Sequence, residues 1–240
     1  MRQTEQEIAT QEQIQRWFDS VYQTQGLDYL RPPEAYPIFL RLLGVSSGQS
    51  LLDVACGPGL LLREARNQGL RACGLDISTV ALTMTPQVAP GALPTAGNAE
   101  ALPFADSVFD YVTCIGAVER FLNREKALSE MRRVARPNAR FCLMVRNSRT
   151  LSWKFAIELL RQRNMVGHQD ADTLESWTTL FKLNGFDIES ILPDQWFRQR
   201  LQRLMPAPLS RISYKPERHI LPLRFANEFI FVLKAAKRVE

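Results

Sequence analysis

The sequence predicts a three-layer α/β/α fold built on a mostly parallel sheet. Seven short apolar segments have the length of strands, and most of them are separated by segments with helical periodicity. The strand segments are apolar on both faces, which is typical of parallel sheets covered by helices on both sides. With 240 residues, 45% of them hydrophobic, the chain can bury one large core. We therefore expect one α/β domain with additional segments.

The predicted elements follow a regular order. Apolar residues recur at three- and four-residue steps over 14–22 and 36–43, which predicts two helices before the first strand. Pro94 places the third strand at a sheet edge, because proline cannot donate to a central ladder. The predicted strands are the segment that begins at residue 51, then 72–77, 92–97, 109–116, 139–145, 186–192 and 228–235. The later predicted helices are 60–69, 78–84, 124–135, 151–163 and 173–184, the last capped by Asp172.

Composition limits the classes of protein to consider. The N-terminus is polar, and the longest apolar runs are well below the roughly 18 to 20 residues of a membrane-spanning helix. We therefore expect a cytoplasmic protein. The four cysteines are far apart and lack a CxxC spacing, so we expect reduced thiols and no metal site.

Positive charge is concentrated near the C-terminus. Residues 194–240 hold ten Lys or Arg and four Asp or Glu, so their net charge is +6. The net charge of the whole chain is +5, and the rest of the chain is therefore nearly neutral. Such a stretch could contact a membrane surface peripherally, bind nucleic acid, or form only a solvated face. The last is the simplest interpretation, and the sequence leaves the choice open.

A glycine-rich turn follows the first predicted strand. The sequence from Asp53 to Gly59 lets the backbone turn tightly and approach a ligand, and the next helix points its N-terminus at the same place. About 20 residues later the second strand ends in Asp76, where a carboxylate can accept from both hydroxyls of a ribose. A dinucleotide turn needs a third small residue, but Leu62 stands there. The spacing favours a nucleoside site over a dinucleotide site.

These residues resemble motif I of class I S-adenosylmethionine-dependent methyltransferases. The resemblance continues through 98–104, 109–112 and 128–145, and so covers residues 48–145. It implies a Rossmann-like three-layer sandwich with a seven-stranded, mostly parallel sheet whose last strand is antiparallel. It also implies S-adenosyl-L-methionine as cofactor, S-adenosyl-L-homocysteine as product, and no metal.

The resemblance also implies roles for individual residues. Asp53 and Gly57 would bind the methionine end of the cofactor, Asp76 the ribose, Ile77 the adenine face and Asn98 the adenine edge. The family usually has Asp where Asn98 stands, but an amide oxygen can still accept from an amino group. The positions that correspond to the family's cofactor site are Asp53, Ala55, Cys56, Gly57, Gly59, Asp76, Ile77, Asn98, Ala99 and Ile115.

Two residues are candidates for a catalytic role. In the family an acceptor attacks the sulfonium methyl group in line, and a hydroxyl acceptor also needs a base. Glu119 follows the fourth strand at the edge where ligands bind, and His168 precedes a helix on the acceptor side. Each has a simpler interpretation, since Glu119 could complement a helix dipole and His168 could be a surface residue. The family commonly has His where Arg120 stands, which weakens a transferred catalytic role.

The remaining segments concern the acceptor. We expect residues 1–44 to form a helical lid, as in similar enzymes, and residues 45–240 the methyltransferase domain. An insertion at 193–227 mixes aromatic and aliphatic residues with arginines. It could cover an apolar acceptor such as a quinone, phenol or polyketide-like compound, rest on lipid, or pack on the sheet edge. The candidate acceptor-pocket residues, each also a candidate for plain packing, are Tyr22, Tyr29, Tyr36 and Trp196.

The predicted reaction is methyl transfer to the O, N or C atom of a small acceptor, with aromatic and apolar compounds as the candidates. Nucleic acid is an unlikely partner, because the chain lacks the Pro-Pro-Tyr and Pro-Cys sequences of base methyltransferases and the charge excess lies at one end. The alternatives are an RNA methyltransferase and a non-catalytic S-adenosylmethionine-binding partner protein. The acceptor, the use of a base and the oligomeric state are left open by the sequence.

Overall fold

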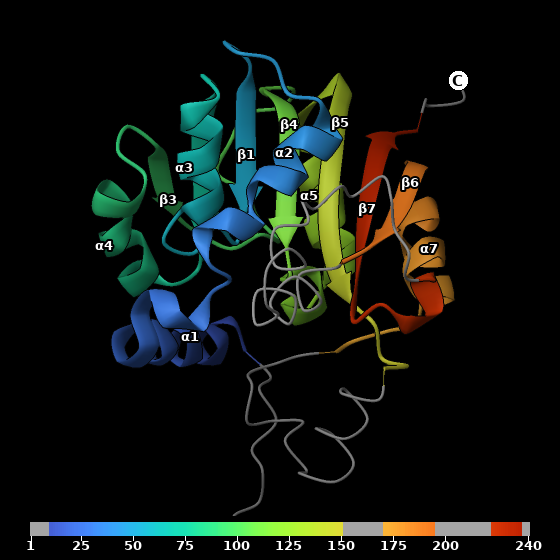
Figure 1. Cartoon of the computed structure of the whole chain (residues 1–240), viewed down its shortest axis with the longest axis horizontal. Coiled ribbons are helices and arrows are strands. Elements are labelled where there is room, and N and C mark those ends of the chain that lie inside the picture. Colours follow the sequence, from blue (N-terminus) through green and yellow to red (C-terminus); the bar gives the residue numbers. More distant parts are fainter. Residues whose placement is uncertain (1–9, 151–169, 195–221, 237–240) are drawn as a thin grey trace, which may run out of the picture.

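The computed structural model describes residues 10–150, 170–194 and 222–236, which contain one seven-stranded sheet (Figure 1). The strand order is β3-β2-β1-β4-β5-β7-β6, and β7 runs antiparallel to both of its neighbours. This confirms the predicted mostly parallel sheet with an antiparallel last strand. The strands are β1 (Ser50–Val54), β2 (Arg71–Asp76), β3 (Leu93–Ala96), β4 (Phe109–Ile115), β5 (Ala135–Arg146), β6 (Phe186–Pro193) and β7 (Glu228–Ala235).

Helices cover both faces of this sheet. One apolar cluster joins α2 and α3 to one face, and a second joins α5 and α7 to the other. The α-helices are α1 (Gln11–Gln25), α2 (Pro37–Leu43), α3 (Leu60–Asn67), α4 (Thr79–Val88), α5 (Arg124–Val134) and α7 (Leu174–Leu183). The short 3-10 helices are η1 (Gly26–Tyr29), η2 (Pro33–Ala35), η3 (Val118–Arg120) and η6 (Leu223–Phe225). Among the described helices, none is long and apolar enough to cross a membrane.

Most elements begin and end within a few residues of their predicted bounds. Three details differ. The helix α4 continues to Val88, because Pro86 lies in its last turn and interrupts little of the ladder. Strand β5 begins four residues early, since Ala135 already pairs with β4. Thr173 caps α7, because its hydroxyl accepts from the Ser176 amide at 3.2 Å. The predicted cap Asp172 instead accepts from the Thr173 amide.

Several predictions fall outside the described residues. They are the helix over 151–163, the candidate base His168, the pocket candidate Trp196 and most of the insertion and of the basic C-terminal stretch. The boundaries of the predicted lid and domain stay predictions.

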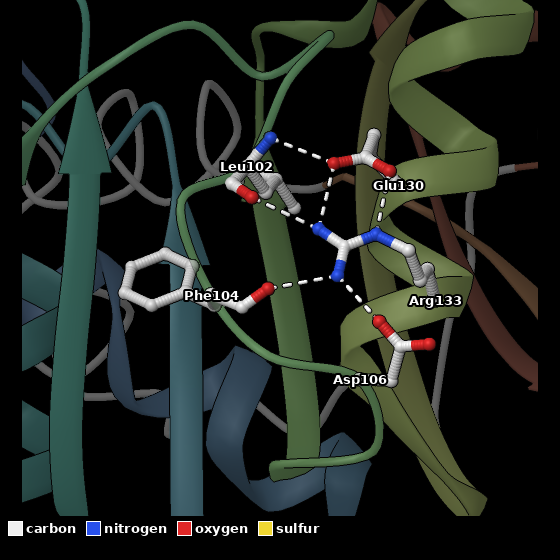
Figure 2. A network of polar contacts seen from close by, with 5 residues as sticks. All are labelled: Leu102, Phe104, Asp106, Glu130 and Arg133. Atoms are coloured by element: carbon white, nitrogen blue, oxygen red, sulfur yellow. Dashed lines mark hydrogen bonds and ion pairs between the residues drawn. The ribbon is translucent and has the colours of Figure 1, made fainter.

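The loop between β3 and β4 is fixed to α5 by one guanidinium (Figure 2). Arg133 donates to the carbonyl oxygens of Leu102 at 2.9 Å and Phe104 at 2.8 Å. It also donates to the carboxylates of Asp106 at 2.6 Å and Glu130 at 2.7 and 2.8 Å. Glu130 in turn accepts from the Leu102 amide at 2.8 Å. The planar fork of an arginine allows all of these bonds at once.

Replacing this guanidinium should loosen the loop. We expect Arg133→Ala to lower the free energy of unfolding by about 2 kcal/mol, because charge-assisted bonds and two carbonyl bonds are lost together. Urea unfolding measures this. The matched control is Arg133→Lys, which keeps the charge but not the fork and should recover only part of the loss. Equal stability of all three proteins would contradict this role.

Candidate functional site

The glycine-rich turn between β1 and α3 is held by the carboxylate at the end of β2. The amide of Gly57 donates to Asp76 Oδ2 at 2.7 Å, and the amide of Ser78 donates to Asp76 Oδ1 at 2.8 Å. Ala55 and Gly57 have positive φ angles of 59° and 53°, so the chain reverses sharply here. Asp76 thereby fixes the turn and the start of α4 relative to each other.

A pocket opens above this turn, at the carboxyl edge of the sheet. It encloses about 710 Å³ of empty space, including its open mouth. The helix α1 runs across this edge, in blue in Figure 1, and contributes part of the wall. The sequence-predicted residues that line the pocket are Ala55, Asp76, Ile77, Asn98, Ala99, Ile115, Tyr22 and Tyr29. The structure therefore brings most of the predicted cofactor site into one cavity.

Asn98 combines a local role with a place in the pocket wall. Its side-chain oxygen accepts from the Glu100 amide at 2.9 Å, which shapes the loop that Arg133 anchors. An amide oxygen has a second lone pair, and the amide nitrogen has two donors. The local bond leaves Asn98 able to bind a ligand edge.

Asp53 lies beneath the turn and does not line the pocket. It is buried in β1, and its Oδ1 accepts from the Thr113 hydroxyl at 2.7 Å. Burial raises the pKa of Asp53 to about 7, against the effect of the Thr113 bond, and the charge of Asp76 adds to the rise. Burial likewise raises the pKa of Asp76 to about 6, while the Ser78 and Gly57 amides oppose the rise. Two buried carboxylates therefore lie under and beside the turn.

The other motif residues have mainly structural surroundings. A Cβ atom on Gly74 of β2 would lie 2.6 Å from both Cys56 Sγ and Leu62 Cδ1, so these side chains fill the space of the missing one. This packing explains how Leu62 is tolerated where a dinucleotide turn has a small residue. Gly59 faces Ala89 and α4. Cys56 and Gly59 thus shape the turn from behind.

Gly57 faces the helix α1. A Cβ atom at this position would lie 2.7 Å from the hydroxyl oxygen of Tyr22. The rings of Tyr22 and Tyr29 pack edge to face with centroids 5.8 Å apart. Tyr36, the third tyrosine candidate, is buried in the core beside α2 and does not line the pocket.

Two polar contacts hold α1 in place. Asp19 accepts from the Ser78 hydroxyl at 2.6 Å and from the Val80 amide at 3.2 Å, at the N-terminus of α4. Gln11 donates to Glu100 at 2.7 Å, in the loop after β3. The helix is therefore tied to the start of α4, which follows β2, and to the loop that follows β3.

The structure adds lining residues that the sequence argument missed. Phe18 from α1, Arg120 from η3 and Phe121 all face the pocket. The Arg120 Cζ atom lies 5.2 Å from the Phe18 ring centroid and 5.7 Å from that of Trp17. The helical spacing of apolar residues that include Trp17 and Phe18 indicated that this face of the helix is buried. Arg120 stood out because the family commonly has His at its position. Neither signal says that the two segments meet.

Glu119 is buried directly behind this wall. Its side chain is fully buried and does not line the pocket, and neither carboxylate oxygen has a hydrogen-bond partner among the described residues. Burial raises the pKa of Glu119, and the charges of Arg120 and Arg146 partly oppose the rise. Its role as a base stays a prediction.

The central part of the chain is similar to known proteins. Residues 52–143 match a family model described as a methyltransferase domain. Demethylmenaquinone methyltransferase of Renibacterium salmoninarum is 38% identical over 98 residues, which are 41% of this chain and 41% of that protein. Malonyl-acyl-carrier-protein O-methyltransferase of Pseudescherichia vulneris is 28% identical over 146 residues, 58% of each chain. The chain thus matches about two to three fifths of the length of these relatives.

A solved structure shares the fold over more of the chain. Phosphoethanolamine N-methyltransferase 2 of Haemonchus contortus, solved in complex with S-adenosyl-L-methionine, superposes with a TM-score of 0.64 at 19% identity. The match covers 93% of this chain and 60% of that one. At this identity the likeness concerns the fold.

The raised pKa of Asp53 predicts a pH-dependent cost of burial. An unfolded aspartate titrates near pH 4, so the folded protein holds more protons than the unfolded chain between about pH 4 and 7. The Asp53 contribution to stability is therefore lost as the pH rises through this window. We expect Asp53→Asn to gain on the order of a few kcal/mol relative to wild type between pH 5 and pH 8. Urea unfolding at both pH values tests this, and a difference independent of pH would contradict it.

Proposed function

We propose that residues 52–143, which match a methyltransferase domain, form a class I S-adenosylmethionine-dependent methyltransferase domain, and that the chain methylates a small, apolar acceptor. The observation that carries the proposal is the single pocket that joins Asp76, Ile77 and Asn98 to an apolar wall from α1 and the segment after β4. Such a pocket has a polar end suited to a nucleoside and an apolar end suited to an organic acceptor.

The residues at the polar end fit the cofactor. Asp76 lines the pocket, and its carboxylate could accept from ribose hydroxyls in addition to the backbone amides that it already binds. Asn98 would bind the adenine edge, and Ile77 would pack on the adenine ring. The resemblance assigns Gly57 to the methionine end, and its backbone packs closely against Tyr22, which lines the pocket.

Methyl transfer of this kind depends on alignment more than on covalent chemistry by the protein. When bound, S-adenosylmethionine supplies a methyl group activated by a positive sulfur. The chain would orient this group through Asp76 and Asn98 and exclude water through α1. Holding two reactants in line can lower the barrier by roughly 7 to 11 kcal/mol. Glu119 lies outside the pocket wall, so the proposal assigns it no proton transfer.

The proposed acceptor class rests on the pocket wall and on the relatives. Phe18, Ala117 and Phe121 give the acceptor side an apolar surface. The relatives' names specify demethylmenaquinone and malonyl-acyl-carrier-protein as acceptors. The first of these is an apolar quinone and the second carries a carboxyl group. Both support a small organic group at the methyl-transfer site over a nucleic-acid base.

Cofactor binding can be tested directly by calorimetry. We expect micromolar binding of S-adenosylmethionine and S-adenosylhomocysteine and no binding of NADH, the control ligand. Asp76→Ala should weaken binding by about 1.5 to 3 kcal/mol, because the ribose hydroxyls lose a charged acceptor. Binding of NADH alone, or unchanged affinity in the variant, would defeat the assignment of this site.

A second prediction concerns the space at Gly57. In Gly57→Ala the new Cβ atom would lie 2.7 Å from the Tyr22 hydroxyl, at a φ of 53° that favours glycine. We expect weaker S-adenosylhomocysteine binding, partly restored by adding Tyr22→Phe, because the nearest remaining atom would be the ring carbon Cζ at 3.4 Å.

A matched control separates strain from contact. Gly48 has a φ of 83° and open space around its missing side chain. Gly48→Ala therefore introduces backbone strain without a collision and should leave cofactor affinity unchanged. Equal losses of affinity in both glycine variants would show that the Tyr22 contact is not the cause.

A further inference from the structure

The helix α1 brings a polar side chain to the end of the pocket assigned to adenine. Gln11, its first residue, lines the pocket together with Ile77 and Asn98. The helix packs beside α4, where Asp19 binds the start of that helix (Figure 1). The apolar spacing that predicted α1 did not select Gln11 as a site residue, because that spacing concerns the buried face only.

Glu100 holds Gln11 next to the loop that carries Asn98. The Gln11 Nε2 atom donates to Glu100 Oε1 at 2.7 Å, and the Glu100 amide donates to Asn98 Oδ1 at 2.9 Å. The same Glu100 oxygen accepts from the amide of Asn123, the N-cap residue of α5, at 3.0 Å. Gln11 and Asn98 are therefore bonded to one residue, which is itself fixed to α5.

The bond to Glu100 also decides which way the Gln11 amide faces. An ionised carboxylate only accepts, so the donor Nε2 must face Glu100 and the acceptor Oε1 lies on the other branch of the amide. Among the described residues, no hydrogen bond uses Gln11 Oε1. Gln11 thus holds an available acceptor whose orientation is set before a ligand binds, which lowers the entropy cost of binding.

Adenine has a donor that matches this acceptor. Its 6-amino group donates, whereas its ring nitrogens only accept. Class I methyltransferases usually have Asp where Asn98 stands, and both oxygens of an aspartate accept. Asn98 has a single side-chain oxygen, which already accepts from the Glu100 amide. An acceptor on a second residue would make up for this difference.

We propose that Gln11 Oε1 accepts a hydrogen bond from the 6-amino group of adenine, so that α1 takes part in recognising the base. This inference rests on the proposed function. Gln11 is then a specificity-determining residue that favours a 6-aminopurine over a purine without the amino group. Glu100 is a positioning residue that acts through Gln11.

The test compares two ligands that differ only in this amino group. They are S-adenosylhomocysteine and its 6-deamino analogue, in which hydrogen replaces the amino group of the purine. Calorimetry gives the affinity of each ligand, and the quantity of interest is the ratio of the two affinities. A change that only loosens α1 would weaken both ligands alike and leave this ratio unchanged.

The variants are Gln11→Leu, Gln11→Ala, Glu100→Gln and a matched control. The control is Gln23→Leu, the same substitution at an exposed position of α1. Wild type and Gln23→Leu should bind S-adenosylhomocysteine about fivefold or more tighter than the analogue, the value of one neutral hydrogen bond. Both Gln11 variants should bring the ratio close to one. Glu100→Gln should keep part of the preference, because an amide at this position can bond either end of the Gln11 amide.

Other outcomes overturn the inference. If Asn98 alone binds the amino group, both Gln11 variants keep the wild-type ratio. A ratio near one in wild type would also refute the inference, because no residue would then recognise the amino group. An unchanged ratio in Glu100→Gln would remove the positioning role of Glu100. Failure of wild type to bind S-adenosylhomocysteine would instead refute the proposed function, so the two failures are distinguishable.

Discussion

The carboxylate of Asp76 is the interaction on which the site depends. It accepts from the Gly57 amide in the turn after β1 and from the Ser78 amide at the start of α4. One side chain thereby fixes two loops that come from neighbouring strands, and α1 is tied to the same place because Asp19 accepts from the Ser78 hydroxyl. Without these bonds the backbone donors of both loops would be buried without partners.

This arrangement places negative charge where water is scarce. Asp53 and Asp76 both have raised pKa values because they are buried, and the charge of Asp76 adds to the rise at Asp53. A cationic ligand that approaches the turn would relieve this cost, since an opposite charge favours the ionised form. The ligand-free protein thus carries an electrostatic cost that a positively charged sulfonium or ammonium group would reduce.

The side of the pocket that follows β4 carries the opposite charge. There a cation, Arg120, lies among aromatic rings supplied by α1, and its Nη2 atom donates to Tyr29. The pocket therefore has an anionic end at β2 and a cationic end after β4, with apolar side chains between them. Because α1 contributes to both ends, its position decides the shape of the pocket as well as its closure.

The sequence by itself determined the strands, the glycine-rich turn and the carboxylates before and after it, because periodicity and turn chemistry are local properties of the chain. The resemblance to class I methyltransferases also implied one shared site for Asp76, Ile77 and Asn98, and all three line the same pocket. Only the tertiary structure decided that Tyr36 lies in the core, that Cys56 and Gly59 support the turn from behind, and that Arg120 meets Trp17 and Phe18. The reason is that these contacts join different elements of the chain, about a hundred residues apart for Arg120 and α1, and no local pattern encodes how those elements pack.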